Sequence, residues 1–165
     1  MRFAVGAALV CVGAVLPLAG CGDGTPKADC GPSTVEQVDS RLYHLLPSSP
    51  SPSYLTDPPT SGPHVSGLRV TGVQNRVLTG IEQVSTLELN IVIVQYGAKI
   101  SADDRAGLER LAGDQVTVAP SGKDDDRVVV TGWMTKMTCA GASPDAVNAF
   151  ITAYKKSSTA PGPGN

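Results

Sequence analysis

The chain has few aromatic residues, only two histidines and no block of positive charge. Its 165 residues include one Trp, two Phe and four Tyr, and 13 Lys and Arg stand against 15 Asp and Glu, for a net charge of −2. Nucleic-acid-binding proteins usually present a clustered cationic face. The composition therefore excludes nucleic acid as an expected partner, and it gives the surface no means of holding anionic lipid by charge.

Long hydrophobic runs are also missing beyond the first twenty residues. Arg2 precedes an apolar stretch that ends in Leu18-Ala19-Gly20, and Cys21 follows. These are the charged start, hydrophobic middle and small-residue cut site of a secretory signal, and the stretch is too short for a permanent spanning helix. The segment resembles the lipobox of bacterial lipoproteins, which implies cleavage before Cys21 and acylation of its thiol. We expect an exported protein, anchored through Cys21 to the lipid bilayer at the outer face of the cell membrane.

Cysteine is scarce, with four residues in all. Cys11 lies in the signal and Cys21 in the lipobox, so Cys30 and Cys139 remain. An even pair in an oxidising compartment favours a disulfide, which would close a loop of about 110 residues. The alternative is two buried free thiols. Their spacing, with no further Cys or His nearby, matches no zinc motif.

Composition divides the chain into four parts. Residues 1–20 form the signal peptide, 21–40 a small and polar tether, 41–156 the folded domain, and 157–165 a Gly-, Pro- and Ser-rich tail that we expect to be disordered. The length suits a single domain.

Three segments of the domain carry clear structural signals. Ile91–Tyr96 is a continuous apolar run, which indicates a strand covered on both faces. Ser101 and Asp104 predict the start of a helix that stops near Gly113. Ser143 as cap and Pro144 at the first position predict a last helix, with a buried stripe of Val147, Phe150, Ile151 and Tyr154 and with Asn148 and Lys155 facing solvent.

The other segments are less regular. Six prolines between residues 47 and 63 exclude regular structure there. Residues 67–71 and 75–79 predict strands around a turn at Gly72-Val73, residues 115–119 and 127–131 predict strands, and residues 83–90 fit either a helix or a strand. Together these elements predict a small single α+β domain, mainly an antiparallel sheet with two or three helices.

One motif is specific. Residues 58–64, Pro-Pro-Thr-Ser-Gly-Pro-His, form a compact segment that we name the proline loop. With this motif the chain resembles an uncharacterised family of bacterial envelope proteins, domain of unknown function 3105. The family also shows a His-x-Leu-Glu-His-Gly element before an apolar strand, then a Trp-containing strand and a C-terminal amphipathic helix. The matching pieces here are His44, Tyr54, Leu87-Glu88, Ile91–Val94, Gln95-Tyr96, Thr131-Gly132-Trp133 and Phe150-Ile151.

The chain departs from the family at the second element, where residues 85–90 are Ser-Thr-Leu-Glu-Leu-Asn. Ser85 and Leu89 replace the two histidines. If the histidines and glutamate of the family form a metal or acid–base site, this chain retains His44, His64 and Glu88. Two imidazoles and one carboxylate fall short of the four ligands of a stable zinc site, so we expect no cofactor. In the structural alternative, His64 hydrogen-bonds within the proline loop and Glu88 accepts from nearby backbone.

No catalytic constellation is complete. Ser61 and His64 lie three residues apart in a proline-bound loop, and nothing matches Gly-x-Ser-x-Gly. We therefore expect a non-catalytic binding or accessory module, not an enzyme. Its binding residues would be Pro59, Ser61 and His64, and its partner an unknown envelope protein or small ligand. The alternative is a metal-binding envelope protein that uses His44, His64 and Glu88.

Overall fold

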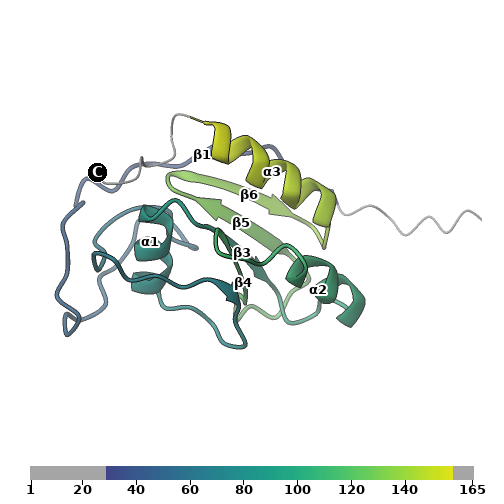
Figure 1. The fold of residues 1–165 in the computed structure, drawn as a ribbon, viewed down its shortest axis with the longest axis horizontal. Coiled ribbons are helices and arrows are strands. Elements are labelled where there is room, and N and C mark those ends of the chain that lie inside the picture. Colours follow the sequence, from purple (N-terminus) through teal and green to yellow (C-terminus); the bar gives the residue numbers. More distant parts are fainter. Residues whose placement is uncertain (1–28, 158–165) are drawn as a thin grey trace, which may run out of the picture.

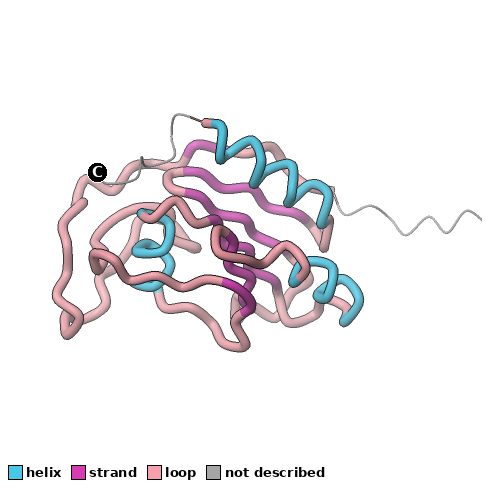
Figure 2. Tube along the Cα trace, viewed as in Figure 1, coloured by secondary structure: helices cyan, strands magenta, loops and turns pink. Residues whose placement is uncertain are grey.

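The computed structural model describes residues 29–157, so the signal peptide, Cys21 and residues 158–165 of the predicted tail lie outside it. Its elements, drawn in Figures 1 and 2, are β1 (Thr34–Val35), β2 (Gly72–Val73), α1 (Gly80–Glu88), β3 (Val92–Tyr96), α2 (Ala102–Glu109), β4 (Val116–Pro120), β5 (Val128–Gly132), β6 (Thr135–Cys139) and α3 (Pro144–Lys156). The strands form one sheet in the order β1-β6-β5-β3-β4-β2. The β1–β6, β6–β5 and β5–β3 pairs are antiparallel, whereas β3–β4 and β4–β2 are parallel. This confirms the small α+β domain.

Strand β3 lies in the middle of the sheet and is buried along its whole length, as predicted. Its alternate residues face two different clusters. Val92 and Val94 pack in the cluster that includes residues of α2 and α3, whereas Ile93 packs with Leu87 of α1. Because successive side chains of a strand point to opposite faces, α2 and α3 cover one face of the sheet and α1 covers the other.

Helix α3 buries Val147, Phe150 and Tyr154, which confirms three of the four predicted core residues; Ile151 is half-buried. Lys155 was expected to face solvent, but its ammonium group donates to the carbonyl of Asn90 and, at 3.1 Å, to Gln115 Oε1. Partial burial accordingly lowers the pKa of Lys155.

The predicted cap of α3 is wrong in one respect. Ser143 occupies the cap position, but its side chain makes no capping hydrogen bond. The helix begins instead with Pro144, whose missing N–H needs no partner at that position. In α2 the predicted cap is confirmed, because Ser101 Oγ accepts a hydrogen bond from the backbone N–H of Asp104 at 3.1 Å. The helix ends at Glu109, before the end expected near Gly113.

The strands expected at 67–71 and 75–79 are absent from the described chain, and the turn expected at Gly72-Val73 is strand β2. The reason is non-local, since Gly72 and Val73 pair with Thr117 and Val118 of β4. Residues 83–90, which fitted either element, belong mostly to α1. Thr79 and Glu82 form a full capping box at its start.

The domain also begins earlier than the tether boundary predicted at residue 40. The Cys30–Cys139 disulfide is present, with Cα atoms 3.9 Å apart, and Thr34–Val35 pairs with β6. Asp39 is 2% exposed, and its backbone N–H donates to Ser61 Oγ at 3.0 Å. Long-range pairing and the disulfide thus fix residues 30–39 on the domain. Within residues 29–157, none of the helices has the length and apolar character needed to cross a membrane.

Candidate functional site

The proline loop is buried from Pro59 to His64. Ser61 is 4% exposed and its hydroxyl accepts from the Asp39 backbone, while Tyr54 donates its hydroxyl hydrogen to the carbonyl of Pro63 at 3.0 Å. All three residues predicted to bind a partner, Pro59, Ser61 and His64, are therefore buried in the domain. Their position suits them to hold the loop in place.

Gly62 shapes the end of this loop. Its φ of 126° is a conformation that side-chain-bearing residues rarely adopt, and an added Cβ would lie 3.1 Å from the Tyr54 ring. Burial and the nearby Asp39 carboxylate raise the pKa of Tyr54 to about 12, so its hydroxyl keeps the hydrogen that it donates to Pro63. The carbonyl of Gly62 is left pointing to His64, where it meets the ring Nδ1 at 2.8 Å.

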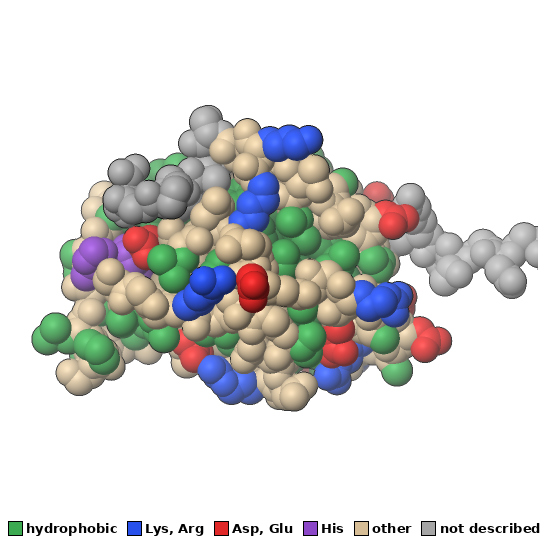
Figure 3. All heavy atoms as spheres, viewed as in Figure 1, with side chains coloured by type: hydrophobic (Ala, Val, Ile, Leu, Met, Phe, Trp, Pro, Cys, Tyr) green, Lys and Arg blue, Asp and Glu red, His purple; other side chains and the backbone are tan. Residues whose placement is uncertain are grey.

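The backbone brings the two histidines side by side. His44 and His64 form a parallel bridge, in which Leu45 N–H donates to the His64 carbonyl at 2.6 Å and His64 N–H donates to the Tyr43 carbonyl at 3.3 Å. The ring centroids are 4.9 Å apart. His64 is 4% exposed and His44 is exposed. Histidine atoms accordingly reach the surface at the left edge of the molecule in Figure 3.

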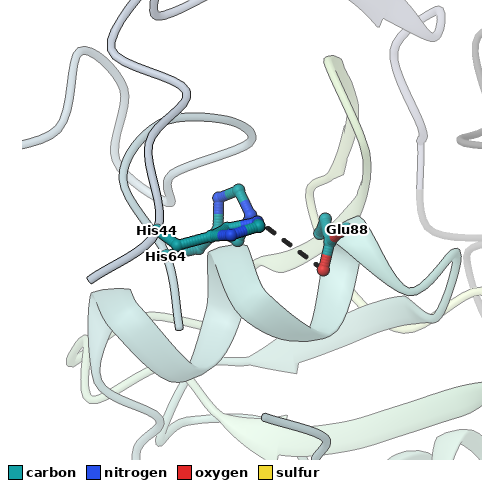
Figure 4. A group of neighbouring side chains, drawn as sticks. All are labelled: His44, His64 and Glu88. Carbon is teal, nitrogen blue, oxygen red and sulfur yellow. Dashed lines mark ion pairs between the residues drawn. The ribbon is translucent and has the colours of Figure 1, made fainter. Parts of the chain in front are cut away.

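Helix α1 brings Glu88 to the same place. Two side chains of the helix fasten it to the chain after the proline loop, since Ser85 Oγ accepts from Val65 N–H at 2.9 Å and Thr86 Oγ1 from Val70 N–H at 3.1 Å. Glu88 is the last residue of the helix, and its Oε2 lies 4.0 Å from His64 Nε2. Figure 4 shows the carboxylate at the helix end turned toward the two imidazoles.

The ligand atoms of His44, His64 and Glu88 all lie within 4.8 Å of one another. His64 Nε2 and Glu88 Oε2 are both buried, and neither has a hydrogen-bond partner. Because a carbonyl can only accept, the hydrogen of the neutral His64 ring is on Nδ1, which leaves the lone pair of Nε2 directed at the cluster. The structural alternative is thus right about the His64 bond within the loop. For Glu88, the described contacts include no backbone donor to Oε2.

Glu88 is also placed unfavourably for an anion. Carbonyl groups at the C-terminal end of a helix carry partial negative charge, and a cation there is stabilising. The last turn of α1 contains no basic residue, and the Glu88 side chain is only 16% exposed. A bound cation would therefore relieve both the unpaired carboxylate and the end of the helix.

Ser85 and Leu89, the two positions where the sequence resemblance implied histidine, behave differently here. Ser85 is fully buried and its hydroxyl serves the loop, so it belongs to the support of the cluster. Leu89 is 36% exposed and supplies no ligand. Asn90 follows with a φ of 60°, a conformation that Asn tolerates better than most residues.

Trp133 completes the surroundings. Its ring lies edge-on to His64 with centroids 5.9 Å apart, and it packs against the hydrophobic clusters of both sheet faces. It is the only Trp of the chain, so its fluorescence reports on this cluster. The sequence analysis had noted Trp133 only as part of the family pattern, because nothing in its local sequence indicates contact with His64.

Comparison with known proteins supports the resemblance seen in the motifs. The model of a family described as "Protein of unknown function (DUF3105)" matches residues 48–165, which include His64 and Glu88 but not His44. No curated protein and no solved structure matches the chain. With most of its length covered by the family model, this chain belongs to the DUF3105 family.

Proposed function

We propose that this protein is an exported, lipid-anchored envelope protein whose domain binds a divalent transition metal through His44, His64 and Glu88. The observation that carries the proposal is the pair of buried, unpartnered atoms, His64 Nε2 and Glu88 Oε2, that face each other beside a second imidazole. Of the two functions that the sequence left open, this favours the metal-binding alternative.

The spacing suits a shared ion. Zinc binds nitrogen and carboxylate oxygen at about 2.0–2.2 Å, so that two ligands of a tetrahedral site lie about 3.4 Å apart. The 4.0 Å between His64 Nε2 and Glu88 Oε2 is close to that value. The ring of His44 is exposed, and its ligand atom lies within 4.8 Å of those of His64 and Glu88. Three protein ligands leave one position for water or a ligand atom of a partner.

The orientation of His64 supports the same conclusion. Metal-binding histidines usually donate their second ring N–H to a carbonyl or carboxylate, which fixes the ring and its tautomer. The Gly62 carbonyl accepts that hydrogen at 2.8 Å, and Gly62 is itself held by the buried proline loop.

A binding role rather than catalysis is supported because the candidate nucleophiles are already engaged in other bonds. Ser61 Oγ is engaged with Asp39, and Cys30 and Cys139 are joined.

Export and anchoring rest on the lipobox at Cys21, which lies outside the described residues. The Cys30–Cys139 disulfide supports export, because such bonds persist in oxidising compartments and are rare in the cytosol. The metal site would then face the envelope space, with the acylated Cys21 holding the domain at the membrane surface.

Calorimetric titration of the full chain in mild detergent with zinc tests the metal-binding proposal. We expect one zinc per chain, and at least tenfold weaker binding in Glu88→Gln and in His44→Gln. Glu109→Gln is the matched control, because Glu109 is the last residue of α2 as Glu88 is of α1. Absence of zinc binding, or equal affinity in Glu88→Gln and the unaltered chain, would contradict the proposal.

A further inference from the structure

Helix α3 and the edge strand β1 enclose an apolar groove of about 630 Å³. Strand β1 is the outermost strand beside β6, and α3 runs along the same edge of the sheet (Figure 1). Buried Phe150 and Met137 lie at the floor of the groove. Three exposed apolar side chains, Val35, Ala149 and Ala153, lie along its sides. Apolar surface that stays open to water marks an interaction site, and this one is separate from the metal cluster.

The polar side chains of the groove are already engaged within the protein. Ser33 Oγ and Thr135 Oγ1 are hydrogen-bonded to each other at 3.2 Å. The Tyr154 hydroxyl accepts from the Trp133 backbone N–H, and Ser157 Oγ donates to the Tyr154 carbonyl, both at 2.8 Å. The described residues that line the groove include no charged side chain. The groove therefore offers mainly apolar contact, which favours a hydrocarbon chain over a polar or charged ligand.

The length of the groove matches that of one acyl chain. On the strand side its lining residues run from Cys30 to Val35, which is about 16 Å at about 3.3 Å per residue. On the helix side they run from Ala146 to Ser157, which is again about 16 Å at about 1.5 Å per residue. The hydrocarbon core of a bilayer is about 30 Å thick, so one acyl chain occupies a depth of about 15 Å.

One end of the groove is the place where the chain arrives from its predicted lipid anchor. Cys30 lines the groove and follows Cys21 by nine residues, a reach of no more than about 32 Å. A tether this short holds an attached group at an effective concentration of about millimolar. Residues 158–165 follow Ser157 at the other end, but they include no Val, Leu, Ile, Met or aromatic residue that could fill an apolar groove.

We propose that the groove binds one acyl chain of the lipid on Cys21 of the same molecule. The proposal rests on the anchoring part of the proposed function and is independent of metal binding. A chain that moves from the bilayer into the groove exchanges one apolar environment for another, and it also covers groove walls that water would otherwise contact. Its binding turns the α3 face of the sheet toward the membrane. Because α1 covers the opposite face, the cluster of His44, His64 and Glu88 then faces away from the bilayer.

Photocrosslinking of the full chain tests this proposal. The chain is produced in a bacterial host supplied with a diazirine-bearing fatty acid, so that its anchor carries the probe, and it is reconstituted into vesicles of ordinary phosphatidylcholine. After irradiation, mass spectrometry should find cross-links from the peptide of Cys21 to β1 or α3. The intact mass of the same sample distinguishes two failures. A chain with no acyl group on Cys21 would overturn the anchoring proposal and this one with it, whereas an acylated chain whose probe reacts only with vesicle lipid would overturn the groove proposal alone.

Two variants place a charge in the groove. Ala149→Glu and Ala153→Glu, at exposed positions of α3, should each lower the yield of cross-links to β1 and α3 at least tenfold. Thr152→Glu is the matched control, because Thr152 is exposed on the same helix and is not among the residues that line the groove. It should leave the yield unchanged, and equal yields in all three variants would contradict the proposal.

A second arm identifies the source of the acyl chain. Here the full chain carries no probe, and the vesicles contain a diazirine-bearing phosphatidylcholine. We expect cross-links to β1 and α3 at no more than a tenth of the yield of the first arm. Equal yields in the two arms would mean that the groove takes membrane lipid in place of the chain's own anchor, and would overturn the proposal.

Discussion

Reduction of the Cys30–Cys139 disulfide should remove a large part of the stability of this domain. The bond joins residues 109 apart in sequence. By loop-closure entropy, releasing a loop of this length lowers the free energy of unfolding by about 4–5 kcal/mol. A domain has only about 5–15 kcal/mol in total. With a urea dependence of about 2 kcal/mol per molar for a small protein, the unfolding midpoint should fall by about 2 M.

Urea unfolding of the full chain in mild detergent, followed by the fluorescence of Trp133, measures this shift. The reduced chain keeps both sulfur atoms, whereas the double variant Cys30→Ala/Cys139→Ala also loses packing at Cys139, which is fully buried. Comparing the two separates the loop constraint from the cavity. A shift below about 0.5 M on reduction would refute the reasoning and would mean that the first strand is held by other contacts.

Three further outcomes are expected. Phe150→Ala should lower the free energy of unfolding by about 3–5 kcal/mol, because the ring is 6% exposed; a loss in urea titration no larger than that of exposed Asn148→Ala would contradict this. Hydrogen bonds from Arg76 lower the pKa of Glu82 from 4.5 to about 2. The contribution of the Arg76–Glu82 ion pair to stability is therefore complete above pH 4.5 and is lost as the pH falls toward 2. Glu82→Gln should reduce the dependence of the unfolding free energy on pH over that interval. An unchanged dependence would contradict a stabilising role of the pair. Cys21→Ser should release the protein from membranes or leave an uncleaved precursor, and unaltered fractionation and processing would remove the anchoring proposal.

The elements that sequence predicted well carry local signals. The apolar run of β3, the Ser101 cap of α2 and the periodic stripe of α3 each depend on neighbours within a few residues. Strand β2 could not be predicted in this way, because two residues become a strand only through pairing with β4. The residues Gly72-Val73 are typical of a turn. A two-residue strand at the edge of a sheet is also too short to show the alternation of apolar and polar residues that marks a strand in the sequence.

The candidate site shows the same division between local features, which the sequence predicts, and long-range contacts, which it does not. Residue chemistry and the family motif identified His44, His64 and Glu88, but their proximity depends on the backbone bridge between residues 44 and 64 and on the bonds from α1 to Val65 and Val70. Neither is encoded in spacing along the chain. Ser61 was predicted to bind a partner because it lies in the proline loop, the specific motif of the chain, whereas its burial and its bond with Asp39 follow only from the fold.

The most direct test of the metal proposal is a crystal structure of the protein grown with zinc, with anomalous scattering measured at the zinc edge. The account predicts one strong anomalous peak between His64 Nε2 and Glu88 Oε2, within about 2.0–2.2 Å of both atoms, with the ring of His44 turned toward it. Zinc bound only at other side chains, with His64 Nε2 and Glu88 Oε2 bridged by water alone, would contradict it.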